Sequence, residues 1–339
     1  MEAAVIGAGG WGTALAVLPA DKGCPVSLWM RSADLYKTII LKRTNEKYLP
    51  GVKLGPLIRP TLELGEALRN KRLVIFAVPS HGLRAVAVAA APHLSPHAIV
   101  VNAAKGLEEP SRLRLSQVLK EELPPELHSQ IAVISGPNHA EEVSRGLPSA
   151  TVAASTNRET ARWVQEALMT PSFRVYTNAD LIGVELGGAL KNVIALGAGI
   201  VEGLELGDNA RAALVTRGLV EMTRLGTALG AHAGTFAGLS GLGDLYATCS
   251  SPHSRNRAVG FKLGRGMRFG EITAGMHTVA EGINTTRVAA ELSRQAGVEM
   301  PITAEIYRVL FEGKLPQKAV DRLMQREKKA ESEESAFKK

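Results

Sequence analysis

The chain has 339 residues, is 45% hydrophobic, 22% charged and 4% aromatic, and carries a formal net charge of +7. This length favours two globular domains. The positive charge could favour binding of nucleic acid, of an anionic membrane or of phosphorylated small molecules. Because aromatic residues are few and no basic run is interleaved with them, we favour small anionic metabolites over nucleic acid.

Targeting and membrane segments are not expected. No apolar run is judged long and charge-free enough to cross a bilayer, so we expect no integral membrane segment. Strand-like residues begin at Ala3, which leaves no room for a signal peptide. Two cysteines, Cys24 and Cys249, are too few for a disulfide framework and predict reduced thiols in a cytoplasmic protein.

Short apolar runs alternate with amphipathic segments through the first half of the chain. The expected strands are Ala3–Ile6, Val26–Met30, Leu73–Val78, Ala98–Asn102, Ile131–Ser135, Ala150–Ala154 and Arg174–Tyr176. The expected helices between them are Ala33–Lys42, Leu62–Arg69, Leu83–Ala91, Leu113–Glu122 and Arg158–Leu168. This alternation predicts an α/β fold with a doubly wound, mostly parallel, Rossmann-like sheet over residues 1–178.

After about Thr177 the strand patterns stop and long helical patterns rich in Ala, Gly and Leu begin. Asp180 is expected to cap a long helix, and further helices are expected at Arg211–Leu229, Ser254–Leu263, Ile283–Gln295, Ile302–Phe311 and Pro316–Gln325. We therefore predict an all-helical substrate and catalytic domain over residues 179–326. Residues 327–339 mix charges with few apolar side chains and predict a disordered tail.

A glycine-rich turn opens the chain. Gly7, Gly9 and Gly12 fit G-x-G-x-x-G, with a strand before them and a helical pattern, Thr13–Leu18, after them. Such a turn lets backbone amides and a helix N-terminus receive a pyrophosphate, so it predicts dinucleotide binding; a turn that serves only packing is the alternative. Pro19 should kink or end the helix near Leu18.

Arg31 stands at the tip of the second expected strand, where NAD enzymes usually place a carboxylate that binds the ribose hydroxyls. The nearest acid, Asp34, is three residues later. An arginine at this place suits a 2′-phosphate and favours NADPH over NADH. The alternative is a solvated loop arginine beside a carboxylate whose position is misjudged.

Polar residues follow three of the expected strands, at the sheet edge where ligands bind. They are Val78–His81, Asn102–Glu108, which includes Lys105, and Ile134–Val143, in which Gly136 and Pro137 open a helical pattern. His81 and His139 could act as acids or bases, but plain hydrogen-bonding roles suit them equally well. No metal site is expected.

Lys191 is the only ionisable residue between Glu185 and Glu202. It either extends to a surface or is held in a site. Burial or nearby positive charge would lower its pKa and make it a usable general acid or base. The neighbouring glycines would permit close approach of a ligand or of another backbone.

Gly238–Gly260 gathers Asp244 and the run Ser254, Arg255, Asn256. An arginine and an asparagine that open a helix suit a phosphate, although a capped helix with a solvated first turn is the alternative. Glu281 follows in a context of small residues, either buried in a site or as a helix-start carboxylate.

With these motifs in order, the chain resembles the bacterial-type NAD(P)-dependent glycerol-3-phosphate dehydrogenase family from Ala4 to about Leu323. The segments that carry the resemblance are VIGAGGWGTALA, AAKGLE, SGPNHAEEV, ELGGALKNVIALGAGI, GLSGLGDLYATCSSPHSRNRAVG and TVAEGINTT. The resemblance implies reversible reduction of dihydroxyacetone phosphate to sn-glycerol 3-phosphate with NAD(P)H, which serves phospholipid synthesis.

The resemblance also implies roles for single residues. Lys191 would be the catalytic acid and base. Substrate would be bound by Lys105, Gly136, Asn138, Lys191, Asp244, Ser254, Arg255 and Asn256. The cofactor would be contacted by Gly7, Gly9, Gly10, Trp11, Gly12, Arg31, Lys105, Ala140, Arg255, Val279 and Glu281. Gly10 departs from the family, which usually has Ser or an equivalent hydrogen-bond donor there, and Asn138 stands at a position that varies within the family.

Two other functions stay open at this point. A β-hydroxyacid dehydrogenase, of the phosphogluconate or ketopantoate type, shares the glycine turn and a helix lysine, but Asp244 and Ser254–Asn256 argue against it. A regulatory protein that binds NADPH without turnover is the second. A homodimer is possible, because the Ala- and Gly-rich helices could bury an interface or form one monomer core.

Overall fold

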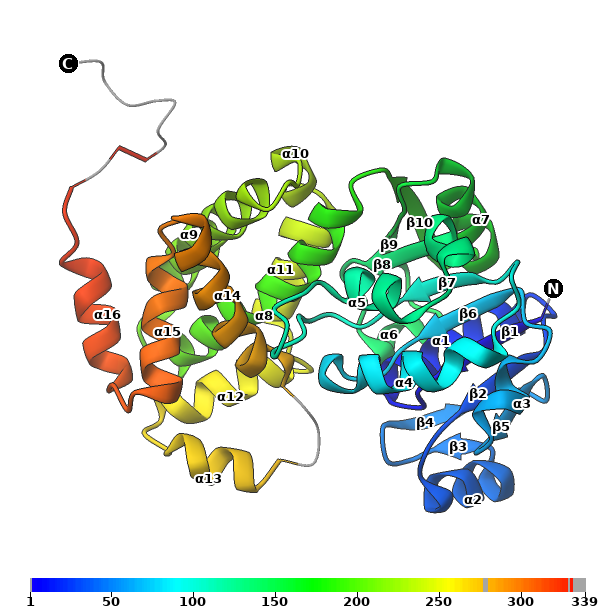
Figure 1. Cartoon of the computed structure of the whole chain (residues 1–339). Coiled ribbons are helices and arrows are strands. Elements are labelled where there is room, and N and C mark those ends of the chain that lie inside the picture. Colours follow the sequence, from blue (N-terminus) through cyan, green and yellow to red (C-terminus); the bar gives the residue numbers. More distant parts are fainter. Residues whose placement is uncertain (1, 277–279, 329, 332–339) are drawn as a thin grey trace.

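The computed structural model describes residues 2–276, 280–328 and 330–331, and Figure 1 shows two lobes joined through one long helix. The first lobe is built on a sheet with the order β10-β9-β8-β7-β6-β1-β2-β5. Its strands are β1 Ala3–Ile6, β2 Val26–Trp29, β5 Ile58–Thr61, β6 Leu73–Phe76, β7 Ile99–Asn102, β8 Ile131–Ser135, β9 Ser149–Ala154 and β10 Phe173–Asn178. The structure thus confirms the predicted fold class.

Six neighbouring strands run parallel to one another, in the order β8, β7, β6, β1, β2 and β5. Strand β9 pairs antiparallel with β8, and β10 runs parallel to β9. Successive residues of β1 pack into different hydrophobic cores on the two faces of the sheet. Ala3 and Val5 belong to one core, and Ala4 and Ile6 belong to the other. Helices cover both faces, which explains why these strands are continuous apolar runs. These helices are α1 Gly10–Asp21, α2 Ala33–Lys42, α3 Leu64–Leu68, α4 Leu83–Ala90, α5 Leu115–Glu122, α6 Ala140–Val143 and α7 Arg158–Leu168.

Three strands were not predicted, namely β5 and the hairpin of β3 Thr44–Asn45 and β4 Leu49–Lys53. Pro50 and Gly51 lie inside β4, and Pro60 lies inside β5. Both residue types have a low propensity for strands, so the sequence of these segments is typical of a loop. Strand β5 is the edge of the sheet, where a proline that donates no hydrogen bond is tolerated.

Of the two alternatives expected at Pro19, a kink or an end of the helix near Leu18, the second is wrong, because α1 includes Pro19 and runs to Asp21. Pro19 lies in the last turn, where its lack of an N–H removes only one helical hydrogen bond. Its carbonyl accepts hydrogen bonds from Lys22 and Cys24, at 3.2 and 3.0 Å, which anchor the turn after the helix.

The second lobe is helical. Its elements are α8 Leu181–Gly203, α9 Gly207–Ala228, α10 Ala233–Phe236, a π-helical turn at Leu239–Gly243, α11 Asp244–Ser250, α12 Arg255–Gly264, α13 Phe269–Ala274, α14 Glu281–Ala296, α15 Pro301–Phe311 and α16 Pro316–Met324. The expected tail from residue 327 falls partly outside the described residues, which omit 329 and 332–339.

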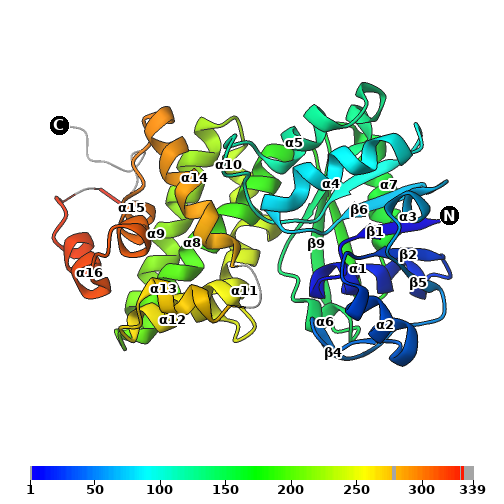
Figure 2. The same cartoon turned by 60° about the horizontal axis from the view of Figure 1, so that its bottom comes forward.

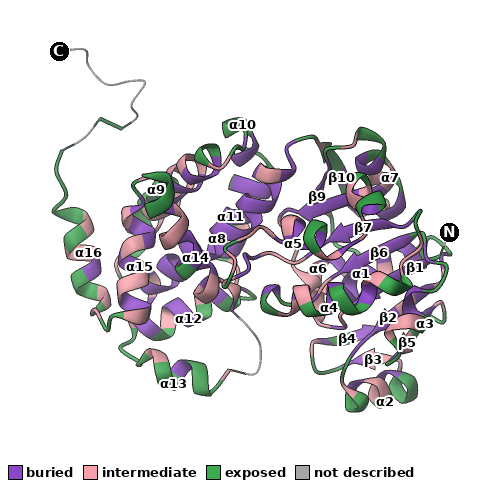
Figure 3. Cartoon of the chain, viewed as in Figure 1, coloured by how far each residue is buried: buried purple, intermediate pink, exposed green. Residues whose placement is uncertain are grey.

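Helix α8 is the core of this lobe, and Figure 3 shows it buried along its length. It crosses α12 so closely that a Cβ on Gly199 would lie 2.0 Å from the carbonyl oxygen of Arg257, and one on Gly260 would lie 2.0 Å from that of Leu196. These two glycines therefore serve the approach of another backbone. Beside Lys191, Gly187 does the same, because a Cβ there would lie 2.6 Å from the Ser240 carbonyl oxygen.

One sequence-based exclusion needs correction. Among the described residues, α8 is long and apolar enough to cross a membrane by length and mean hydropathy. Its apolar window is entirely buried inside the protein, however, which is the arrangement of a core helix. The sequence analysis did not identify α8 as long and apolar enough to cross a membrane, because Lys191 interrupts its apolar run.

Asp180 caps α8 as expected and does more than that. Its Oδ1 accepts a hydrogen bond from the amide of Gly183 at 2.8 Å. Its Oδ2 accepts bonds from the His232 amide at 2.9 Å and from the Thr235 hydroxyl at 2.6 Å. One carboxylate thus ties the start of α8 to the segment that opens α10.

We expect Asp180→Ala to lower the free energy of unfolding by about 3 kcal/mol, because one cap is lost and buried donors are left without an acceptor. Urea denaturation would measure this as a lower midpoint. The control is Asp208→Ala, which removes an exposed ion pair with Arg211 and should cost under about 0.5 kcal/mol. Equal effects of the two changes would refute the anchoring role of Asp180.

Candidate active site

The glycine turn lies at the switch point of the sheet, between β1 and β6. Gly7 has a φ of 114°, a left-handed conformation that favours glycine. A Cβ on Gly12 would lie 1.9 Å from the carbonyl oxygen of Gly7, so the helix packs directly on the turn. Helix α1 begins at Gly10, three residues before the predicted start, and its first amides point out of the helix end without partners inside the helix.

Gly10 is enclosed by other segments of the chain. A Cβ there would lie 2.7 Å from the carbonyl oxygen of Tyr48 and 3.7 Å from the Cβ of Ala140. Trp11 packs beside Ala140 and the hairpin residue Leu49. The Trp11 indole Nε1 is buried, and the described chain offers it no hydrogen-bond acceptor. The structure therefore brings together Gly10, Trp11 and Ala140, and the close hairpin explains why no larger side chain stands at position 10.

Arg31 is exposed just beyond the end of β2, and the described residues offer it no ion-pair partner. Ser32 caps α2, where its hydroxyl accepts a hydrogen bond from the Leu35 amide at 3.2 Å. Asp34 lies in the first turn of α2 and is exposed. The tip of β2 thus presents a free cation, as the NADPH prediction requires.

Two lysines from different lobes share one buried carboxylate. The Lys191 ammonium, 5% exposed, donates to Asp244 Oδ1 and to the Thr248 hydroxyl, the latter at 2.6 Å. Lys105 donates to Asp244 Oδ2 and to the Gly136 carbonyl, both at 2.7 Å. Lys191 is therefore held in a site, and the alternative of a lysine that extends to the surface is wrong.

Burial is the main reason that the pKa of Lys191 falls to about 7, and the positive charge of Lys105 lowers it further. The Asp244 carboxylate opposes both effects by stabilising the ammonium form. A lysine in this range can gain or lose a proton near neutral pH. Burial also raises the pKa of the nearby Cys249 thiol to about 12, so this cysteine stays protonated.

The Ser254–Asn256 run begins α12, and its three side chains lie in different environments. The Ser254 hydroxyl caps the helix by accepting a hydrogen bond from the Arg257 amide at 3.2 Å. Arg255 is exposed, and within the described chain it has no ion pair. Asn256 is buried: its Nδ2 donates to Asn192 Oδ1 at 2.9 Å, and its Oδ1 accepts from the Gly282 amide at 3.0 Å.

Only part of this run is thus free for a ligand. Arg255 presents its whole guanidinium, whereas Asn256 keeps one amide hydrogen after its internal bonds. Asn256 also joins Lys105 to the same network, because Asn192 donates to the Lys105 carbonyl at 3.3 Å. The two alternatives for this run therefore apply to different residues. Ser254 caps the helix, whereas Arg255 is free to bind a ligand.

Glu281 opens α14 and reaches the first lobe. Its carboxylate accepts hydrogen bonds from the Ser80 amide at 3.0 Å and from the Ser80 hydroxyl at 2.5 Å. A Cβ on Gly106 would lie 2.9 Å from Glu281 Oε2, so the residue after Lys105 lies against this pair. Val279, the other expected contact from this segment, lies outside the described residues.

The loop after β8 supplies Gly136, Asn138 and His139. Asn138 Nδ2 donates to the Ala150 carbonyl at 2.8 Å, which leaves its buried Oδ1 without a partner in the described chain. Burial lowers the pKa of His139, whose ring lies 5.9 Å from that of His253. His81, by contrast, is exposed in a short turn after β6.

Sequence reasoning missed Thr248 and Ser80. Thr248 lies four residues after Asp244, on one face of α11, so a helix prediction there would have found it. Ser80 lies in the Val78–His81 cluster, but nothing in the sequence shows its contact with a residue 201 positions away.

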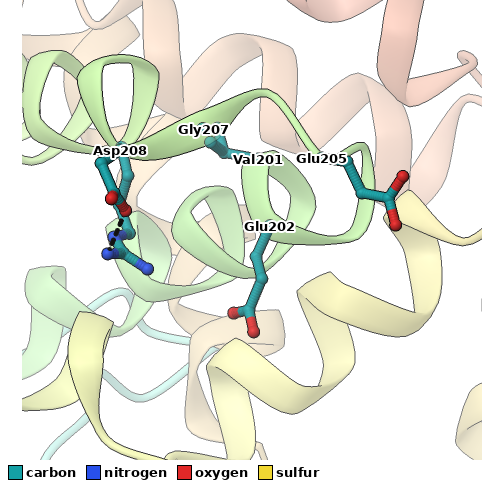
Figure 4. A pocket seen from close by; sticks show the side chains of 6 residues that line it. Val201, Glu202, Glu205, Gly207 and Asp208 are labelled. Atoms are coloured by element: carbon teal, nitrogen blue, oxygen red, sulfur yellow. Dashed lines mark hydrogen bonds and ion pairs between the residues drawn. The ribbon is translucent and has the colours of Figure 1, made fainter.

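A separate cavity of about 220 Å³ lies between the end of α8 and the start of α9, as Figure 4 shows. It is lined by Val201, Glu202, Glu205, Gly207, Asp208 and Arg211, none of which is a predicted site residue. Its charges are partly matched inside the chain, since Arg211 pairs with Asp208 at 2.6 Å and Arg257 with Glu202 at 2.6 Å. The lysine and carboxylate cluster is therefore the better candidate.

Comparison with known proteins covers both lobes. The pattern of the NAD-dependent glycerol-3-phosphate dehydrogenase N-terminus matches residues 2–161, and that of its C-terminus matches residues 180–321. A glycerol-3-phosphate dehydrogenase [NAD(P)+] of Pelotomaculum thermopropionicum is 52% identical over 336 residues, which is 99% of this chain and 96% of the relative. One from Desulfitobacterium hafniense is 53% identical over 334 residues, or 98% of this chain and 94% of the relative.

Among solved structures, the glycerol-3-phosphate dehydrogenase of Coxiella burnetii superposes with a TM-score of 0.91 at 38% identity. The match covers 96% of this chain and 99% of the Coxiella chain. Sequence patterns, full-length relatives and the fold therefore agree, and this chain belongs to the NAD-dependent glycerol-3-phosphate dehydrogenase family.

Proposed function

We propose that this protein reduces dihydroxyacetone phosphate to sn-glycerol 3-phosphate with NADPH or NADH, in a reversible reaction that supplies phospholipid synthesis. The observation that carries the proposal is the Asp244 carboxylate that holds Lys105 and Lys191 together. Membership of the family identifies the substrate. The cluster contains an acid, Lys191, whose pKa lies near neutral pH.

The residues around the glycine turn suit a dinucleotide. Helix α1 offers unpaired amides behind Gly7, and the buried Trp11 Nε1 is a donor without an acceptor. We propose that Gly7, Gly9, Gly10, Trp11, Gly12, Arg31, Lys105, Ala140, Arg255, Val279 and Glu281 hold the cofactor. When bound, its nicotinamide supplies or accepts the hydride.

Lys191 is proposed to donate its proton to the oxygen at C2 of the substrate, where negative charge develops. Asp244 keeps the ammonium form populated before this transfer, and Lys105 adds a second positive charge beside it. In the reverse direction the neutral amine of Lys191 takes the proton from the hydroxyl. Thr248 accepts a hydrogen bond from Lys191 and so fixes the direction of its ammonium group.

Substrate is proposed to bind through Lys105, Gly136, Asn138, Lys191, Asp244, Ser254, Arg255 and Asn256. Arg255 is the main candidate for the phosphate, because its forked donors are free and it opens a helix. A remote grip on the phosphate orients the carbonyl carbon for transfer. A cytoplasmic location and a homodimer stay predictions; the glycine contacts of α8 and α12 described above lie inside one chain and do not argue for a dimer.

The first test is a spectrophotometric assay with dihydroxyacetone phosphate and each reduced cofactor. We expect turnover, and we expect Lys191→Ala to lower kcat by at least about a hundredfold because the general acid is lost. NADPH binding should stay nearly intact. Binding of NADPH without turnover by the unchanged protein would favour the regulatory alternative, and reduction of ketopantoate or another oxoacid instead would favour a β-hydroxyacid dehydrogenase.

The pH dependence tests the acid separately. Reduction needs the ammonium form of Lys191, so kcat/KM for dihydroxyacetone phosphate should fall as the pH rises through about 7. Asp244→Asn removes the charge that raises this pKa, so the fall should move to lower pH. An unchanged position of this limb in Asp244→Asn would show that another group causes it.

Cofactor choice is tested at Arg31. Arg31→Asp should weaken NADPH binding by about tenfold or more, because a charge-assisted contact to the 2′-phosphate becomes a repulsion. NADH binding, which involves no 2′-phosphate, should change little. Fluorescence titration of both cofactors gives the two constants, and an equal loss for both would contradict the assignment.

A further inference from the structure

Most of the net positive charge of the chain lies in one segment, residues 31–59. Residues 31–59 hold seven Lys and Arg against two Asp and Glu, an excess of five in a chain whose net charge is +7. They form α2, the β3–β4 hairpin and the edge strand β5. Of these seven cations, only Arg31 belongs to the proposed site. The hairpin reaches the glycine turn, because a Cβ on Gly10 would lie 2.7 Å from the Tyr48 carbonyl oxygen. Lys37 and Lys42, by contrast, lie on α2, which carries none of the proposed site residues.

One face of α2 points into solvent and is partly apolar. Ala33, Lys37, Ile40 and Leu41 are exposed and recur at i, i+4, i+7 and i+8, so they share one face of the helix. Leu41 is 81% exposed and Ile40 is 47% exposed. Leu35, on the opposite face, is buried in the core. Two large aliphatic side chains therefore stand together on the surface without a packing role.

Exposed cations lie on α2 itself, on the β3–β4 hairpin and on β5. They are Lys37, Lys42, Lys47, Lys53 and Arg59. Among the described residues none of them forms a close ion pair, although the charge of Arg59 helps to lower the pKa of Glu2. Arg43 differs, because it donates to the Leu54 and Ile58 carbonyls at 3.3 and 2.9 Å and supports the chain. Figures 1 and 2 both place α2 beside the hairpin and β5, at a corner of the first lobe remote from α14–α16. We call these five cations with Ile40 and Leu41 the α2 surface.

We infer that the α2 surface binds the anionic face of a lipid bilayer, reversibly and without insertion of a helix. Each lysine near such a surface strengthens binding by about fivefold, and exposed aliphatic side chains add contact with the acyl boundary. A second copy of this chain is a poor occupant, because a two-fold contact would oppose like charges. Nucleic acid fits less well, because lysines dominate the patch and its two aromatic residues, Tyr36 and Tyr48, are partly buried against the core instead of standing free for bases to stack on.

This inference goes beyond the proposed reaction and does not depend on it. Docking through α2 leaves the helical lobe, which carries Lys191 and Arg255, on the side away from the contact. An enzyme held there would release its product beside a bilayer. Membrane binding and turnover are measured separately, so failure of one is distinguishable from failure of the other.

The test is co-sedimentation of the full chain with vesicles of phosphatidylcholine alone or with about one-third phosphatidylglycerol, at low and high salt. We expect binding to the anionic vesicles that weakens as salt rises. Lys37→Glu with Lys42→Glu should weaken it by at least about twentyfold. Ile40→Ser with Leu41→Ser should weaken it too while the salt dependence persists. Turnover in solution should be unchanged in both variants, which shows that they fold.

The matched control is Lys120→Glu with Lys318→Glu, which changes the net charge equally at exposed positions on α5 and α16. Its binding should stay close to that of the unchanged protein. Three results would overturn the inference: no sedimentation with anionic vesicles at low salt, an equal loss in the control, or tighter binding to an oligonucleotide through Lys37 and Lys42 than to vesicles.

Discussion

The carboxylate of Asp244 is the interaction on which the arrangement of the site depends. Two ammonium groups, from Lys105 of the first lobe and Lys191 of the second, would repel each other if they lay this close in a buried site without it. One carboxylate with both oxygens engaged removes that repulsion and fixes the positions of both lysines. It also limits how far burial lowers the pKa of Lys191, because the negative charge favours the ammonium form.

The lobes are coupled by a small apolar cluster, in which Val133 and Val152 of the sheet pack against Val184 of α8, and by several polar contacts. Glu185 on α8 accepts bonds from the Ser116 amide at 2.7 Å and from its hydroxyl at 2.6 Å, and Arg114 donates to the same carboxylate at 3.0 Å. Together with the contact of Lys105 with Asp244, this contact holds the segment between β7 and α5 against the second lobe, while Glu281 holds the turn after β6 through Ser80. The loop that carries Lys105 is thus held at both ends.

The sequence predicts the scaffold better than it predicts the site. The buried strands are apolar runs, and Asp180 and Ser254 are strong caps, so these elements follow from local chemistry. The hairpin and β5 do not, because Pro50, Gly51 and Pro60 contradict their strand geometry and only tertiary packing offsets them. Lys191 left two possibilities open, since burial depends on partners far along the chain. The contact of Glu281 with Ser80 had no local signal of any kind.

Helix α8 has a consequence for how the chain must fold. It is synthesised early in the second lobe, yet it crosses α12 and packs against α14, which emerge about fifty and eighty residues later. Until then an apolar segment long enough to cross a membrane lies uncovered. Such a nascent chain is exposed to aggregation and to misrouting towards a bilayer, so assembly of the second lobe depends on late, long-range contacts that arrive fast enough to cover it.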